Sequence, residues 1–127
     1  MTSSSSNPTQ SNPALEVDER PWGRYTVLLD CPHTKVKRIE VNPGHRLSLQ
    51  KHAHRQEHWV IVKGQGEVHL NGNIIPVTAG DTVQIDQGSV HRIANLSDEP
   101  MEFIEVQLGD YFGEDDIVRL EDDYNRT

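Results

Sequence analysis

Hydrophobic residues along this chain recur in short runs that mostly alternate with polar residues and end at turn-forming residues. Such alternation predicts half-buried β-strands, and no long segment shows the period of an amphipathic helix. At least eight runs at near-regular spacing predict an antiparallel sandwich or barrel. The runs are residues 36–41, 45–54, 57–62, 67–70, 74–77, 81–85, 89–94 and 101–108.

Two details refine the predicted sheets. Asn71 and Gly72 form a two-residue link between neighbouring runs, which is a strong hairpin signal because both residues tolerate positive φ. Pro76 has no backbone N–H to donate, so its run is predicted at a sheet edge or at a strand end.

The parity of the runs assigns side chains to faces, because successive residues of a strand point to opposite sides. In the run 45–54, Gln50, His52 and His54 share a face opposite Leu47 and Leu49. A face that carries two imidazoles and an amide indicates a binding or catalytic site rather than a hydrophobic core surface.

The following run has two apolar faces, one with Trp59 and Ile61 and the other with Val60 and Val62. One face can line the interior, and the other then needs a cover. A second subunit would provide it, so we expect a homodimer. The alternative cover is the C-terminal segment from Asp110 onward.

Composition limits the class of protein. The length of 127 residues predicts one domain, residues 14–127, after a Ser-, Asn- and Pro-rich tail, residues 1–13, that is expected to be disordered. There is no secretory signal and no membrane-length apolar run, so a cytoplasmic protein is expected. The net charge of −8 argues against nucleic acid or a membrane surface as a partner.

Histidines concentrate between residues 50 and 59, and they suggest a metal site. His52 and His54 are spaced to reach one ion from a strand, Glu57 follows after a turn, and His91 lies on a distant strand. Zinc, iron, manganese and nickel accept imidazole and carboxylate ligands together. A single histidine is more often a surface or core residue, so the order of several residues has to carry the assignment.

That order resembles the two motifs of the cupin superfamily, with one departure in the second motif, where Asp86 replaces the usual proline. In the first motif the gap from His54 to Glu57 is short, which leaves His58 as an alternative to Glu57. The resemblance implies an all-β fold, the double-stranded antiparallel β-helix or cupin jelly-roll barrel. The residues that match are Gly44, His52, His54, Glu57, Gly64, Gly80, Gly88, His91 and Asn95.

Three longer stretches make the resemblance more specific. "RPWGRY", "VNPGHRLSLQKHAHRQEHWVIVKG" and "IEVQLGDYFGEDDIVRLEDDY" look like the type II phosphomannose isomerase domain, and the likeness covers nearly everything after residue 19. In that family the domain often follows a mannose-1-phosphate guanylyltransferase domain. This chain has no glycine-rich phosphate loop, so guanylyl transfer is not expected of it alone.

The resemblance implies isomerisation of mannose 6-phosphate to fructose 6-phosphate through an enediol. The implied cofactor is a divalent metal ion, zinc first, with manganese, iron, cobalt and nickel as alternatives. The implied ligands are His52, His54, Glu57 and His91, and Gln50 is either a fifth ligand, a sugar contact or an interior hydrogen-bonding residue.

The reaction also needs a base and a phosphate receptor. Glu105 is the first choice for the base if it faces the core with Phe103 and Gln107, where its pKa is expected to be raised. Gln107 would then contact the sugar. The alternative is that Ile104 and its neighbours face the core. The cations expected at the sugar phosphate are Lys37, Arg55 and Arg119, of which Arg55 is also a catalytic candidate. Each of these cations is alternatively a surface charge or half of an ion pair.

Two other functions compete with the isomerase. The chain is alternatively a non-catalytic module that binds a sugar phosphate or a nucleotide sugar, or a cupin with another chemistry such as an oxygenase or epimerase.

Overall fold

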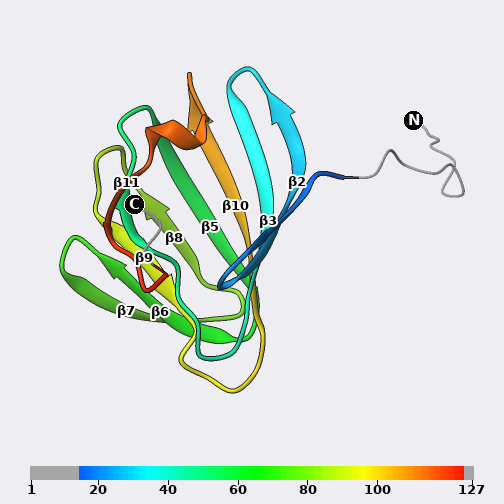
Figure 1. Cartoon of the computed structure of the whole chain (residues 1–127), viewed down its shortest axis with the longest axis vertical. Helices are drawn as coiled ribbons and strands as arrows, with labels where there is room; N and C mark the ends of the chain where they lie inside the picture. The colour runs from blue at the N-terminus through cyan, green and yellow to red at the C-terminus, as the bar shows by residue number, and fades with distance from the viewer. Residues whose placement is uncertain (1–14, 125–127) are drawn as a thin grey trace, which may run out of the picture.

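Two antiparallel β-sheets pack face to face in the computed structural model, which describes residues 15–124 (Figure 1). All strand pairings are antiparallel, which confirms the predicted all-β architecture. The predicted disordered tail, residues 1–13, lies outside the described residues. The larger sheet has the order β1 (Val17–Arg20), β2 (Gly23–Cys31), β3 (Thr34–Val41), β10 (Met101–Gly109), β5 (Arg55–Lys63) and β8 (Thr82–Ile85).

The smaller sheet faces the larger one and ends at a strand from the C-terminal part of the chain. A short 3-10 helix, η1 (Glu114–Asp116), precedes that strand. The order is β11 (Val118–Glu121), β4 (Leu49–Lys51), β9 (His91–Ala94), β6 (Gln65–Leu70) and β7 (Asn73–Thr78).

The inner faces of the sheets form the core. Trp59 and Ile61 are buried, whereas Val60 and Val62 are 39% and 43% exposed on the outer face, which the expected homodimer would cover. In β10 the buried positions include Phe103 and, against the general rule for carboxylates, Glu105. Of the two alternatives for this strand, the structure therefore shows the one that places Glu105 inside.

The hairpin and edge predictions are confirmed. Asn71 and Gly72 have φ values of 50° and 88°, and they join β6 to β7 with Leu70 paired to Asn73. Pro76 lies in β7, which is an edge strand where a missing donor is tolerated.

The prediction of one strand across residues 45–54 is wrong. Only Leu49–Lys51 is a strand, with an isolated bridge between Arg46 and Ala94. The chain then turns, because the backbone N–H groups of Ala53 and His54 donate to the carboxylate of Asp116 at 3.0 and 2.9 Å instead of to a strand. Parity therefore stops at Lys51 and cannot place His54 beside His52.

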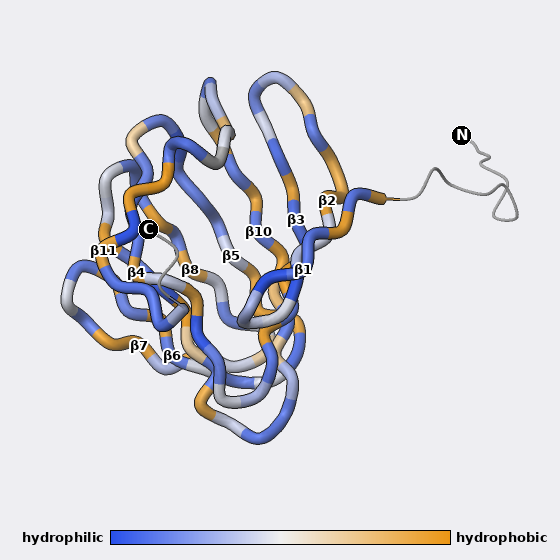
Figure 2. The backbone as a smooth tube through the Cα atoms, viewed as in Figure 1, coloured by the Kyte–Doolittle hydropathy of each residue, from blue (hydrophilic) through white to orange (hydrophobic). Residues whose placement is uncertain are grey.

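Three strands, β1, β2 and β11, were not predicted. In β2 the register shifts between Val27 and Leu29, which interrupts the alternation that marks a strand. The other two are edge strands of four residues each. Hydrophobic residues lie in short stretches along residues 15–124 (Figure 2), and no helix in this part of the chain is long and apolar enough to cross a membrane.

Candidate metal centre and cavity

A cavity that is partly open to solvent lies between the two sheets. Strands of both sheets contribute to it, so residues far apart in the sequence meet there. The predicted site residues in its lining are Lys37, Gln50, Arg55, Glu57, His91, Glu105 and Arg119.

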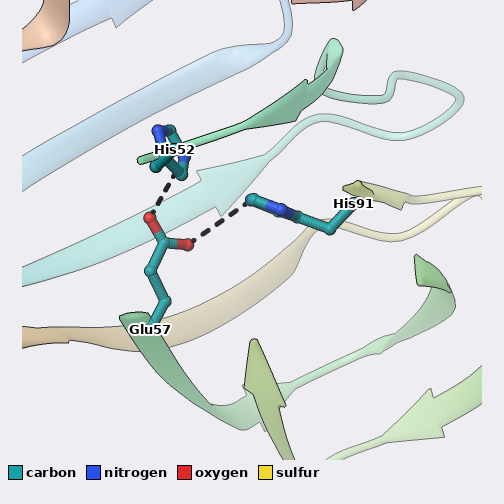
Figure 3. A group of neighbouring side chains, drawn as sticks. All are labelled: His52, Glu57 and His91. Atoms are coloured by element: carbon teal, nitrogen blue, oxygen red, sulfur yellow. Dashed lines mark ion pairs between the residues drawn. The ribbon is translucent and has the colours of Figure 1, made fainter. Parts of the chain in front are cut away.

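Three buried residues, His52, Glu57 and His91, form a cluster whose potential ligand atoms lie within 4.8 Å of one another. This cluster is called the metal group below. The Nε2 atoms of His52 and His91 lie 3.3 and 3.7 Å from the two carboxylate oxygens of Glu57 (Figure 3). Metal–ligand bonds of about 2.0–2.2 Å place neighbouring ligand atoms roughly 3–3.5 Å apart. The group therefore fits a divalent ion after small movements of the side chains.

Both imidazoles have the protonation state that a ligand needs. Nδ1–H of His52 donates to the carbonyl of Asp116 at 3.2 Å, and Nδ1–H of His91 donates to that of Ser89 at 3.0 Å. Because a carbonyl only accepts, these bonds leave Nε2 without a proton. Burial and the nearby charge of Arg55 lower the pKa of His52 to about 3, and burial lowers the pKa of His91, so both rings are neutral at pH 7.

His54 is not part of this group, contrary to the sequence prediction. It is exposed, and its ring lies edge-on to Tyr111, with the ring centroids 6.0 Å apart. The turn after Lys51 explains the difference, because His54 no longer alternates with His52 on one strand. The half-buried His58 also lies outside the group, so Glu57 is the carboxylate that the structure brings to the imidazoles.

Arg55 is buried beside the metal group. Its Nε–H donates to Glu57 at 3.0 Å, and its Nη2 lies 3.2 Å from Nε2 of His52. The structure thus shows Arg55 as half of an ion pair, one of the two alternatives for this cation. Its Nε–H and charge hold the Glu57 carboxylate in place.

Glu105 lies next to Glu57 and shares a donor with it. The indole N–H of Trp59 lies 3.1 Å from an oxygen of each carboxylate, and Gln107 donates to Glu105 at 2.6 Å. Burial and the charge of Glu105 raise the pKa of Glu57 well above its ordinary value. Burial acts in the same direction on Glu105, but the charge of Lys37 and hydrogen bonds bring its pKa below the ordinary value. The raised pKa predicted for Glu105 is therefore wrong, because Lys37 favours its ionised form.

The remaining predicted residues surround this pair. Lys37 is buried, and its Nζ lies 4.0 Å from the ring centroid of Tyr25. Gln50 donates to the hydroxyl of Ser48 at 3.0 Å, which is the interior hydrogen-bonding alternative. Arg119 is paired with Gln50 across β11 and β4, so its side chain reaches the cavity from the edge of the smaller sheet.

Several cavity residues were not predicted as site residues. Arg20, Trp22 and Tyr25 line the cavity from the N-terminal part of the chain, and Ser48 and Arg92 line it from the smaller sheet. Alternation offers no signal for the first three, because their strands were not predicted. The stretch "RPWGRY", which contains all three, is the signal that identifies them.

Solved structures share the fold. Capsular polysaccharide assembling protein CapF from Staphylococcus aureus superposes with a TM-score of 0.78 at 24% identity, over 91% of this chain and 35% of that one. An uncharacterised protein with a double-stranded β-helix domain from Klebsiella pneumoniae gives a TM-score of 0.68 at 25% identity, over 91% and 90% of the two chains. The fold is therefore the double-stranded β-helix, as predicted.

Relatives found by sequence share a higher identity with this chain than these two solved structures do. Xanthan biosynthesis protein XanB from Xanthomonas campestris is 48% identical over 108 residues, which are 85% of this chain and 23% of that protein. Alginate biosynthesis protein AlgA from Pseudomonas aeruginosa is 49% identical over 108 residues, 85% of this chain and 22% of AlgA. The chain thus spans less than a quarter of the length of these curated relatives.

The family model described as "Mannose-6-phosphate isomerase C-terminal" matches residues 10–122, which include the whole cavity and every residue of the metal group. The chain therefore belongs to the mannose-6-phosphate isomerase C-terminal family.

Proposed function

We propose that this chain interconverts mannose 6-phosphate and fructose 6-phosphate with a divalent ion held by His52, Glu57 and His91. Zinc is the first choice for this ion. The observation that supports the proposal is the buried group of two neutral imidazoles and one carboxylate. Two of its residues, Glu57 and His91, line a cavity that is also lined by a second carboxylate and several cations. Membership of the isomerase family selects this chemistry among those that the group permits.

A divalent ion bound there would stabilise the negative charge that develops on the sugar oxygens. The proton that moves between C1 and C2 needs a base, and Glu105 is suited to this role because Lys37 favours its ionised form. The N–H groups of Trp59 and Gln107 fix the orientation of its carboxylate. The buried Oε1 of Gln107 has no hydrogen-bond partner among residues 15–124.

The test is exchange of the C2 hydrogen of mannose 6-phosphate with solvent deuterium, followed by NMR. We expect exchange with zinc- or manganese-loaded protein, and its loss with chelator and in His91→Ala. His58→Ala removes a half-buried imidazole outside the group and should retain exchange. Pure protein with a full complement of metal and no exchange would contradict the proposal.

The second candidate is a non-catalytic module that binds a sugar phosphate or a nucleotide sugar. Its support is that the chain spans only 23% of the length of XanB, so activity in such relatives need not reside in this part alone. Calorimetric binding of mannose 6-phosphate without hydrogen exchange would favour this function over the isomerase.

A further inference from the structure

Arg119 lines the cavity and has a buried donor without a partner. Its Nε is inaccessible to solvent and has no hydrogen-bond partner in the part of the chain that the structure describes. Buried donors are rarely left unsatisfied in folded proteins, because an unpaired polar group is unfavourable. An orphaned guanidinium N–H in a cavity lining therefore points to a ligand that completes it.

The other cations of the cavity have protein partners. Arg55 is bonded to a carboxylate. Arg92 donates to a backbone carbonyl at 3.0 Å and to a carboxylate at 3.3 Å. Lys37 and Arg20 lie over the ring of one tyrosine. Within residues 15–124 no carboxylate forms an ion pair with Arg119, so its charge remains available for an external anion.

The position of Arg119 relates it to the metal group. Arg119 is paired with Gln50, and Gln50 is paired with His91, so the three residues form a row across β11, β4 and β9. Paired residues present their side chains on one face, and adjacent strands are about 4.8 Å apart. The backbones of Arg119 and His91 are therefore separated by roughly 10 Å.

This spacing suits an elongated ligand with an anion at one end. In a hexose 6-phosphate the reacting carbons, C1 and C2, and the phosphoryl group lie at opposite ends of the carbon chain. With C1 and C2 near His91, the molecule would extend past Gln50 toward Arg119. The planar guanidinium carries a fork of N–H donors that matches the oxygens of a phosphate.

We propose that Arg119 binds the terminal phosphate of the substrate and thereby selects phosphorylated sugars over free sugars. The sugar in this inference rests on the proposed function. The phosphate contact can be tested without turnover, because it needs only binding.

The experiment is calorimetry on the full, metal-loaded chain with mannose 6-phosphate, mannose and inorganic phosphate as ligands. In Arg119→Gln we expect affinity for mannose 6-phosphate to fall about 10–100-fold, the usual effect of losing a charged hydrogen bond. Arg119→Lys keeps the charge without the fork and should recover part of that loss. Arg24→Gln removes an exposed cation of the larger sheet and should change the affinity less than about twofold.

Thermal unfolding without ligand separates this role from a structural one. An unsatisfied buried donor does not stabilise the fold, so Arg119→Gln should unfold at the same temperature as the parent or higher. A clear fall in unfolding temperature, in Arg119→Lys as well, would assign a structural role and overturn the proposal. Unchanged affinity of Arg119→Gln for both phosphate ligands would also overturn it.

The outcome for isomerisation is separate. If the parent protein binds phosphate through Arg119 but never exchanges the C2 hydrogen, the phosphate contact stands and the isomerase proposal fails. If it exchanges hydrogen and Arg119→Gln binds mannose 6-phosphate like the parent, the isomerase proposal stands and the assignment of Arg119 fails.

Discussion

Asp116 lies outside the metal group and contacts the segment that carries His52. Its backbone carbonyl accepts Nδ1–H of His52, and its carboxylate accepts the N–H groups of Ala53 and His54. One residue thus fixes both the ring of His52 and the turn that carries it. Partners of this kind around a metal ligand determine how well the ligand is oriented.

We predict that Asp116→Asn weakens zinc binding by about tenfold, because partners of metal ligands typically contribute 10–100-fold to affinity. The amide replaces one of the two acceptor oxygens with a donor, so one backbone N–H of the turn loses its partner. The measurement is competition for zinc against a chelator of known affinity. Asp98→Asn, at an exposed aspartate remote in sequence, is the matched control and should bind zinc like the parent. Equal zinc affinity in the two variants would exclude this role for Asp116.

At the scale of elements, β3 and β10 are joined by an ion pair on the outer face of the larger sheet. Arg38 donates to the two oxygens of Glu102 at 2.8 and 2.9 Å. These hydrogen bonds lower the pKa of Glu102 against the opposing effect of burial. The folded pKa is then below the unfolded value of 4.5, so the stabilisation is present above pH 4.5 and is lost as the pH falls through the folded pKa.

We predict that Glu102→Gln lowers the free energy of unfolding at pH 7 by no more than about 1 kcal/mol, as is usual for a partly exposed pair. Urea denaturation at pH 7 and at pH 3 measures the difference from the parent, which should shrink at the lower pH. Salt at 1 M should reduce it at pH 7, because the Debye length is then about 3 Å. In Glu99→Gln, the control for loss of an exposed carboxylate, salt should have little effect. A difference that grows toward pH 3 would mean that the ion pair does not stabilise the folded chain in this way.

Strands β5 and β10 and the turn after β4 show how much of the fold and of the site could be predicted from the sequence. Alternation correctly separated the face of Trp59 and Ile61, which is buried, from that of Val60 and Val62, because a strand of regular pleat has only two faces. It misplaced His54, because the turn that interrupts the strand depends on Asp116, more than sixty residues later. It left Glu105 open, since both faces of β10 carry hydrophobic residues and only contacts with Trp59 and Lys37 decide which one is buried. Contacts distant in sequence thus limited the prediction more than local propensity did.

At the scale of the whole molecule, the candidate metal centre lies where the two sheets meet. Glu57 belongs to β5 of the larger sheet, His91 belongs to β9 of the smaller sheet, and His52 follows β4 of the smaller sheet. An ion bound by all three would link the sheets. Since it would bind the folded chain and not the unfolded one, it should stabilise the fold.

We predict that zinc at one hundred times its dissociation constant stabilises the chain by about 2.7 kcal/mol. For a domain of this size the midpoint of thermal unfolding should rise by roughly 10 °C. Calorimetric scans with zinc and with chelator measure the shift, which His91→Asn should abolish and His58→Asn should keep. An equal shift in His91→Asn would place the stabilising ion elsewhere.

The hydrogen bonds from the two imidazoles to backbone carbonyls have a consequence for how a divalent ion would enter the candidate site. Because these bonds already orient both rings, capture of an ion would require movements of side chains only, among them that of Arg55, whose Nη2 lies 3.2 Å from Nε2 of His52. A ready-made pair of imidazoles with one carboxylate follows the general order of divalent affinities and does not by itself reject a competitor. The supply of divalent ions, together with the geometry of the site, would then decide which element is bound.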